Sequence, residues 1–188
     1  VKHKVLILVI AVLLLIPSAF GYFHTRVNYD ILNYLPDDIE TMKGQEIMVD
    51  EFGTGAFSMC VVEGMSDKDI SAMRKEMCKV EGVKDVLWYD SFMDLSVPID
   101  LLPDSIKDVF VNKDADSTIM FVLYPNSISA DETMEAIESL RKVMNKRCFL
   151  SGMSAVVTDT KNLSNKETPI YVLIAVILST IVLALAMD

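Results

Sequence analysis

The chain has 188 residues, of which 52% are hydrophobic, and a formal net charge of −10. Every charged residue except Lys2, Lys4 and Asp188 lies between two apolar runs at the ends of the chain. This length allows one domain of ordinary size plus two membrane spans. The acidic middle argues against nucleic acid as a partner, because phosphate backbones repel it.

The two apolar runs predict transmembrane helices over residues 1–23 and 169–188, since each is long enough to cross a bilayer and carries no charge in its interior. Lys2 and Lys4 place the N-terminus in the cytoplasm, so the middle domain is expected outside the cell membrane. A cleaved signal peptide ending near Ala19-Phe20-Gly21 is the alternative. Because no Asp, Glu, Lys, Arg or His lies inside either span, a proton relay is expected elsewhere. The start at Val1 and the end beside a span are typical of a piece of a longer polypeptide.

Residues 24–55 are predicted to form an extracytoplasmic strand and helix that lead into the domain. The strand is expected over 28–35. The helix is expected over 38–52, with apolar residues at helical spacing at Ile39, Met42, Val49 and Phe52. Gly53-Thr54-Gly55 would end it.

Residues 56–151 contain two strand-helix-strand patterns. The first has strands at 56–63 and 83–89 around a helix that Ser66 caps; its predicted apolar face is Ile70, Met73, Met77 and Val80. The second has strands at 117–124 and 147–150 around a helix that begins with a capping box of Ser129 and Glu132; its predicted apolar face is Met134, Ile137, Leu140 and Met144.

Two such units predict an α+β fold, a ferredoxin-like double βαβ porter domain with two helices on one face of an antiparallel sheet. The fourth strand is expected beside the first. Between the units, residues 90–114 are irregular, with a short helix over 105–111 whose Ile106, Val109 and Phe110 face inward. Residues 152–168 are predicted as a helical connector, with apolar or uncharged positions at Met153, Val156, Val157, Thr160 and Leu163, and Pro169 in or near the first membrane turn.

Candidate chemistry is sparse, and we predict no catalytic, cofactor-binding or metal-binding residue. His3 and His24 lie at the two ends of the first span, out of easy reach of a core site. The Gly53 and Gly55 pair lacks the lysine and the spacing of a phosphate-binding loop. The acidic pairs fall at predicted helix ends, where carboxylates stabilise a turn or stay solvated; they are Asp37-Asp38, Asp50-Glu51 and Asp131-Glu132.

The three cysteines, Cys60, Cys78 and Cys148, are expected to be small buried hydrophobes. A Cys60–Cys148 bridge is the alternative, if their strands are neighbours. Asn162-Leu163-Ser164 fits the glycosylation triplet, which also arises by chance. Ser179 and Thr180 are expected to bond back to helix carbonyls within the last span.

Three stretches resemble the MMPL branch of the resistance-nodulation-division (RND) permeases. They are VNYDILNYLPDD at 27–38, PIDLLPDSIKDVF at 98–110 and the long return from Gly152 to Asp188. The resemblance implies the first span, first porter domain and second span of a multi-pass exporter of the cell membrane. Proton-driven export of hydrophobic or lipid-like molecules would be the work of the complete protein, and its proton-carrying residues lie on a later span.

The implied partners are the remaining spans and second half of the permease, the lipid bilayer and a hydrophobic or amphiphilic substrate, with a homo-oligomer left open. The mechanism would be a change in the packing of the domain against the second half, with loop 90–114 as a contact region and the substrate-binding residues unassigned. The alternatives are the outer sensor domain of a two-span receptor and a two-span scaffold protein. An enzyme is the least favoured class.

Overall fold

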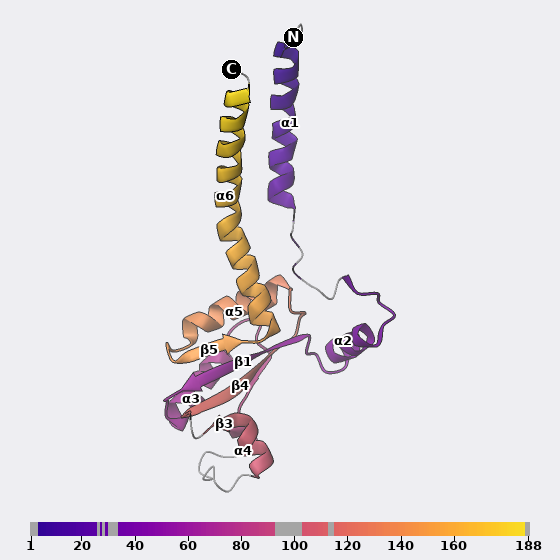
Figure 1. Ribbon diagram of the computed structural model, residues 1–188. Helices are drawn as coiled ribbons and strands as arrows, with labels where there is room; N and C mark the ends of the chain where they lie inside the picture. The colour runs from indigo at the N-terminus through magenta and orange to yellow at the C-terminus, as the bar shows by residue number, and fades with distance from the viewer. Residues whose placement is uncertain are drawn as a thin grey trace.

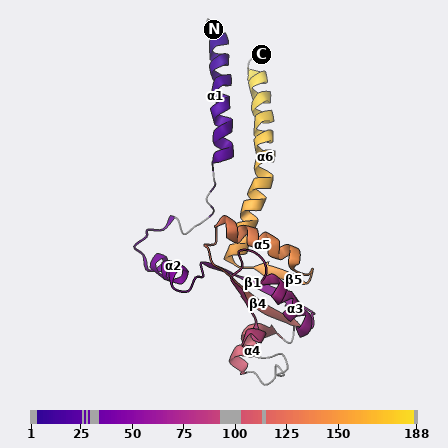
Figure 2. The same ribbon diagram turned by 180° about the vertical axis from the view of Figure 1, so that it is seen from behind.

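The computed structural model describes residues 4–25, 27, 29, 34–92, 103–112 and 115–186. It is an α+β domain from which two long helices extend at one end, with both chain termini far from the domain (Figures 1 and 2). The prediction of an α+β fold is confirmed. The elements in chain order are α1 (Lys4–His24), α2 (Glu40–Asp50), β1 (Ala56–Glu63), α3 (Asp67–Met77), β2 (Asp85–Leu87), the 3-10 helix η2 (Tyr89–Ser91), α4 (Asp104–Phe110), β3 (Val111–Asn112), β4 (Ser117–Tyr124), α5 (Asp131–Val143), β5 (Cys148–Ser151) and α6 (Met153–Ala186).

The sheet has the strand order β2-β4-β1-β5, and β3 also pairs with β4. All pairs are antiparallel, so the two longest strands, β1 and β4, lie at the centre. Both have the bounds that their apolar runs predict. β5 lies beside β1, as expected for the fourth strand, whereas the two-residue strand β3 was not predicted.

The third predicted strand, 83–89, is only partly confirmed, because β2 ends at Leu87 and Tyr89 begins η2. The backbone turns at Trp88, whose N–H donates to Ser91 Oγ at 3.2 Å while its carbonyl accepts from Ser91 N–H at 2.9 Å. Alternation of apolar residues continues through this turn, and therefore the sequence pattern overestimates the strand.

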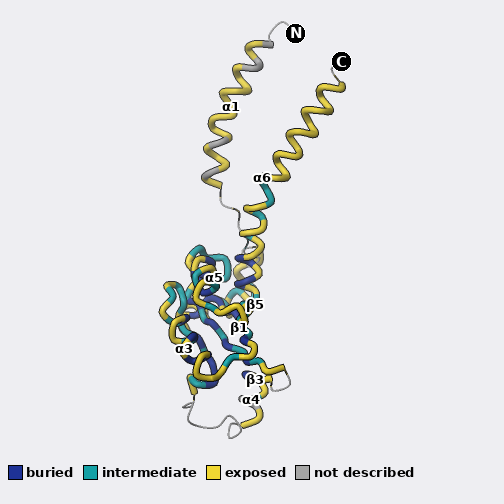
Figure 3. The backbone as a smooth tube through the Cα atoms, turned by 90° about the vertical axis from the view of Figure 1, so that its left-hand side faces the viewer, coloured by how far each residue is buried: buried dark blue, intermediate teal, exposed yellow. Residues whose placement is uncertain are grey.

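The hydrophobic core lies between the sheet and the helices α3 and α5. Alternate residues of β1 and β4 are buried along their whole length, and Figure 3 shows this burial concentrated inside the domain. From α3 and α5 the predicted apolar faces are largely confirmed, since Ile70, Met73, Met77, Met134, Ile137 and Leu140 are buried. Val80 and Met144 follow the ends of these helices and are partly buried.

The two core helices begin differently. Ser66 caps α3 as predicted, with its hydroxyl accepting from Asp69 N–H at 3.3 Å. The predicted capping box at Ser129 and Glu132 is wrong, because the N-cap of α5 is Ala130, which has no side-chain acceptor. A turn in which Ala130 N–H donates to the Ser127 carbonyl at 3.2 Å delays the start of the helix.

Two glycines allow close backbone contact around this core. A Cβ at Gly55 would lie 2.5 Å from the carbonyl carbon of Asn126, so the entry to β1 packs directly on the end of the β4 turn. Gly82 has a φ of +83°, and its Cβ would lie 2.9 Å from the carbonyl oxygen of Glu132 in α5. Both positions need glycine for space or conformation.

The shorter helices pack less than the sequence suggests. α2 is shorter than the predicted 38–52 helix and has no buried residue. In α4, Phe110 is buried as predicted, but the expectation that Val109 faces inward is wrong, since its side chain is 50% exposed. The side chain of Ile106, most of the predicted strand 28–35 and much of loop 90–114 lie outside the described residues.

α6 is one continuous helix of 34 residues that contains both the predicted connector and the last apolar run, with Pro169 in its interior. Its buried residues are Ser154, Ala155, Val157 and Thr158, and of the predicted apolar positions only Val157 is among them. Met153, Val156 and Leu163 are each more than half exposed. Small side chains are buried because this helix approaches β1 closely, with Ser154 Oγ donating to the Phe57 carbonyl at 2.9 Å.

Within the described residues, α6 is the helix long and apolar enough to cross a membrane. Its most apolar 18 residues have a mean hydropathy of 2.6, and none is buried. α1 is a 21-residue helix that contains the apolar stretch Val9–Tyr22. Inside the last run, Thr180 Oγ1 donates to the Val176 carbonyl at 2.7 Å, as predicted.

Candidate functional site

One side of the sheet carries a continuous set of apolar side chains that α3 and α5 do not cover. Strand register places Phe57 opposite Leu123, Met59 opposite Phe121, and Val61 between Ile119 and Phe149. These pairs alternate with the residues buried under the helices and therefore point to the other side. We call this set the open face; it consists of Phe57, Met59, Val61, Leu87, Ile119, Phe121, Leu123 and Phe149.

The open face is partly exposed to solvent. Phe57 and Phe149 are each 53% exposed; Phe57 lies on the central strand β1 and Phe149 on the neighbouring edge strand β5. Phe110 of α4 covers one end, where its ring meets that of Phe121 edge to face at 5.9 Å between centroids. A cluster of exposed apolar side chains of this kind is typical of a surface that binds an apolar molecule or another domain.

A small apolar cavity adjoins the open face at Phe57. It has a volume of about 170 Å³, and its other lining residues include Met48 of α2, Ile128 and Met153 of α6. Gln45 Nε2 donates to the Gly55 carbonyl at 2.6 Å and fastens α2 beside it. The cavity therefore lies where α2, the start of β1 and the base of α6 meet.

The helix-covered side of the sheet carries two of the three cysteines. All three are free thiols. Cys60 in β1 is directly opposite Leu150, and Cys148 is opposite Val62, so the two cysteines are diagonal neighbours on adjacent strands. A hydrogen bond from Cys60 lowers the pKa of the Cys148 thiol to about 7, while the same contact and burial raise the pKa of Cys60.

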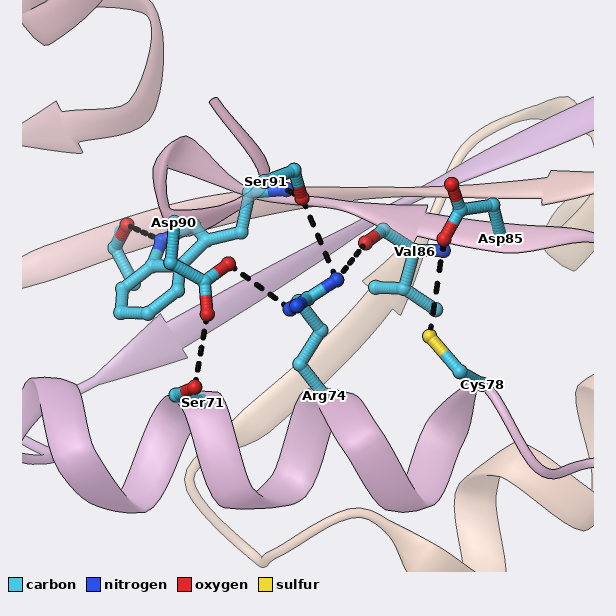
Figure 4. Close-up of polar contacts among 9 residues, drawn as sticks. Ser71, Arg74, Cys78, Asp85, Val86, Asp90 and Ser91 are labelled. Carbon is cyan, nitrogen blue, oxygen red and sulfur yellow. Dashed lines mark hydrogen bonds and ion pairs between the residues drawn. The ribbon is translucent and has the colours of Figure 1, made fainter. Parts of the chain in front are cut away.

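A buried polar network fastens η2 to α3 (Figure 4). Arg74 Nε lies 2.9 Å from Asp90 Oδ1, and these side chains are only 17% and 6% exposed. Ser71 Oγ donates to the other oxygen of Asp90 at 2.8 Å, and Arg74 also donates to the Val86 carbonyl at 3.1 Å. Asp90 of η2 thus contacts two residues of α3, and Arg74 of α3 contacts the backbone of β2. We call this network the clamp, because it joins α3 to both elements. It holds the chain just after it leaves β2.

A second set of polar contacts joins the base of α6 to α5. Arg141 makes a bidentate pair with Asp159, at 2.6 and 2.9 Å. Lys161, two residues after Asp159 in α6, has its Nζ 3.1 Å from Oδ1 of Asp131 in the first turn of α5. The domain is thereby attached to the long apolar helix through several turns of continuous α-helix, which transmits displacement better than a flexible linker.

A wider cavity lies beside this attachment and includes Asp131 and Lys161 in its lining. Its volume is about 610 Å³, and it is lined by polar residues of α5 and α6 together with Thr25, Val27 and Tyr29 from the segment after α1. Asp131, Glu132 and Lys161 bring charges of both signs to its wall. It therefore differs in character from the apolar cavity next to the open face.

The candidates from the sequence are scattered. Asp131 and Glu132 lie in the first turn of α5, and Asp50 ends α2, as expected for carboxylates at helix ends. His24 is exposed and bonds to the Phe20 carbonyl at 3.0 Å. Asn162 lies within α6, where its amide donates to Glu138 at 2.9 Å. Among the described residues, no three His, Cys, Asp or Glu side chains cluster closely enough to hold a metal ion.

Sequence reasoning did not identify the open face. The signal was present, because AFSMCVVE and STIMFVLY are apolar at nearly every position, whereas a strand with one solvated face alternates. A strand that is apolar on both sides predicts a cover on both sides. In the described part of the chain, α3 and α5 supply a full cover to one side.

Comparison with known families supplies the context for this surface. A family model described as the MMPL family matches residues 33–187, which include α2, the sheet, its helices and α6. No curated protein matches the sequence. The match covers more than half of the chain and agrees with the resemblance at 27–38 and 152–188. The chain therefore belongs to the MMPL family.

Proposed function

We propose that this chain is the N-terminal portion of an RND/MMPL-type exporter, in which the α+β domain is a porter domain outside the cytoplasm. Its four main strands have the order and direction of a ferredoxin-like double βαβ sheet, which supports this assignment. Residues 1–23 and 169–188 would be the two flanking spans. The role is transport rather than catalysis, and no cofactor takes part in it.

The arrangement of α1 and α6 supports the topology. Both helices extend from the same end of the domain, so that residues near both termini lie on the side away from the sheet (Figure 1). Lys2 and Lys4 next to the first apolar run favour a cytoplasmic N-terminus. The end of α6 then also lies at the cytoplasmic side, and the domain is extracytoplasmic.

The apolar character of the open face supports a hydrophobic or lipid-like substrate. Phe57 and Phe149 expose aromatic surface to water. An alkyl chain would contact this surface and displace the water, whereas a polar solute would not. No Asp, Glu, Lys, Arg or His lies within residues 5–23 or 169–187, and we therefore assign the proton-driven step to the remaining spans. The domain would pass the substrate on by changing its packing against the second half of the permease.

The single observation that carries this proposal is an apolar, partly exposed sheet face in a chain of the MMPL family. It is tested in the complete permease, reconstituted in vesicles with a pH gradient and a fluorescent lipid analogue. Phe57→Asp and Phe149→Asp are expected to lower the export rate at least about tenfold, since a buried charge at an apolar contact costs more than 1.4 kcal/mol.

Val143→Asp is the matched control, because Val143 is an exposed apolar residue on α5, away from the open face. Its export rate is expected to stay near that of the unmodified protein. Circular dichroism and vesicle incorporation show whether each variant is folded and inserted. Unchanged export in both phenylalanine variants would refute a role of the open face in transport.

A further inference from the structure

Three sulfur-containing side chains lie together on the helix-covered side of the sheet, between β1, β5 and α3. Cys148 Sγ donates a hydrogen bond to Met73 Sδ at 3.5 Å. Cys60 is the diagonal neighbour of Cys148 on the adjacent strand, on the same side of the sheet. Cys60 is fully buried and Met73 is 9% exposed, whereas Cys148 is only half-buried and gives access from solvent.

The two thiols and the thioether of this cluster are soft ligands, and the thioether of Met73 lies directly against the Cys148 thiol. Cys78, the third cysteine, lies at the end of α3 and donates to Asp85 at 3.8 Å instead.

We propose that Cys60, Cys148 and Met73 form a binding site for a single soft monovalent metal ion, Cu(I). Thiolate and thioether sulfur select Cu(I) over hard cations, and Cu(I) is satisfied by two or three such ligands. Zinc would need a fourth ligand to complete a tetrahedron. Binding displaces the protons of the two thiols and involves no change of oxidation state.

The positions of the cysteines favour a metal over a disulfide. Diagonal neighbours on antiparallel strands have Cα atoms roughly 7–8 Å apart. A disulfide needs Cα atoms about 4.4–6.8 Å apart, so that it would require backbone movement. A metal ion between the sulfurs, with bonds of about 2.3 Å on each side, spans the longer separation without such movement.

The test uses the whole chain in detergent under anaerobic conditions, with Cu(I) as the added ion and bicinchoninate as the competing chelator. One Cu(I) per chain is expected, with X-ray absorption reporting sulfur neighbours alone. Cys148→Ser is expected to weaken binding at least about 100-fold, because it removes a ligand rather than an outer partner. Met73→Leu, which nearly conserves volume, is expected to remove one sulfur neighbour and weaken binding about tenfold or more.

Cys78→Ser is the matched control and should bind Cu(I) like the unmodified chain. The proposal would be overturned if the unmodified chain failed to compete with the chelator for Cu(I). It would also be overturned if the Cys148→Ser and Met73→Leu variants bound Cu(I) as tightly as the unmodified chain. A protein mass two hydrogens below that of the free thiols, which identifies a Cys60–Cys148 disulfide, would overturn it as well. If Cys148→Ser fails to fold, the Met73→Leu comparison decides. Export activity enters none of these readouts, and the proposal therefore stands apart from the transport function.

Discussion

The two faces of the central strands have similar apolar composition but different surroundings. Cys60, Val62 and Met120 are fully buried under α3 and α5, while Phe57 and Phe149 on the opposite side are more than half exposed. A sheet and a layer of helices form a complete core with one face of the sheet. The exposed phenylalanines of the open face, Phe57 and Phe149, are therefore expected to add less to folding than the covered residues, as in a surface available for binding.

Adjacent residues of β4 test most directly whether the two faces of the sheet contribute differently to stability. Met120 is fully buried, whereas its neighbour Ile119 belongs to the open face and is only half-buried. Met120→Ala is expected to lower the free energy of unfolding by about 2–5 kcal/mol, and Ile119→Ala by less than about half of that amount. Urea denaturation of the whole chain in detergent measures both. Equal losses would show that the open face is part of the folding core.

The clamp on the covered side predicts the next largest effect. Asp90→Ala leaves the guanidinium of Arg74 without its carboxylate, and both side chains are largely buried. The expected loss in the free energy of unfolding is about 3 kcal/mol, the lower end for a broken buried pair because Arg74 keeps some access to water. Ser91→Ala is the comparison variant; it removes a 3.4 Å contact to Arg74 and the acceptor of the Trp88 N–H but leaves the buried ion pair intact, and it should cost less. Similar losses in the two variants would contradict the clamp.

The three thiols are expected to differ in their reactivity, because their burial and hydrogen bonds differ. The Cys148 pKa of about 7 predicts that iodoacetamide modifies this residue with a rate that rises through pH 7. Burial raises the pKa of Cys78 above its ordinary value, and therefore its reaction should begin only at higher pH. Cys60 should stay unmodified in the folded chain because it is fully buried. Peptide mass spectrometry at several pH values follows each site, and a reversed order of Cys148 and Cys78 would contradict the hydrogen-bonded pair.

The smallest effect is expected where α6 joins α5. Arg141 and Asp159 are bidentate but exposed, with 33% and 59% of their side chains accessible. A double-mutant cycle of Arg141→Ala and Asp159→Ala should give a coupling energy of about 0.2–1 kcal/mol, because solvent screens the pair. Added salt should reduce this coupling further. A larger coupling energy that does not change with salt would contradict this prediction and show that the pair behaves like the buried Arg74–Asp90 pair.

Secondary structure was predictable wherever one residue pattern was long and undisturbed. β1 and β4 have their predicted bounds because each is eight residues of nearly uninterrupted apolar sequence. The shorter elements were not predictable to the same degree. β2 stops at Leu87 because Ser91 bonds back to Trp88, and α5 starts after Ser129 because a turn intervenes. Local contacts of this kind carry no periodic signal in the sequence.

The candidate site could be predicted only in part, for a physical reason. The sequence by itself determined the two apolar ends, the doubled strand-helix-strand order and strands that are apolar on both sides, because these depend on residue type and local spacing. Tertiary structure alone decided which side α3 and α5 cover, and thus that Phe57 and Phe149 remain exposed. It also decided that Cys148 lies against Met73, on the side of the sheet that carries Cys60. Those outcomes depend on the pairing of β1 with β4 and β5, strands far apart in the chain, and on the helices that the pairing brings onto one face.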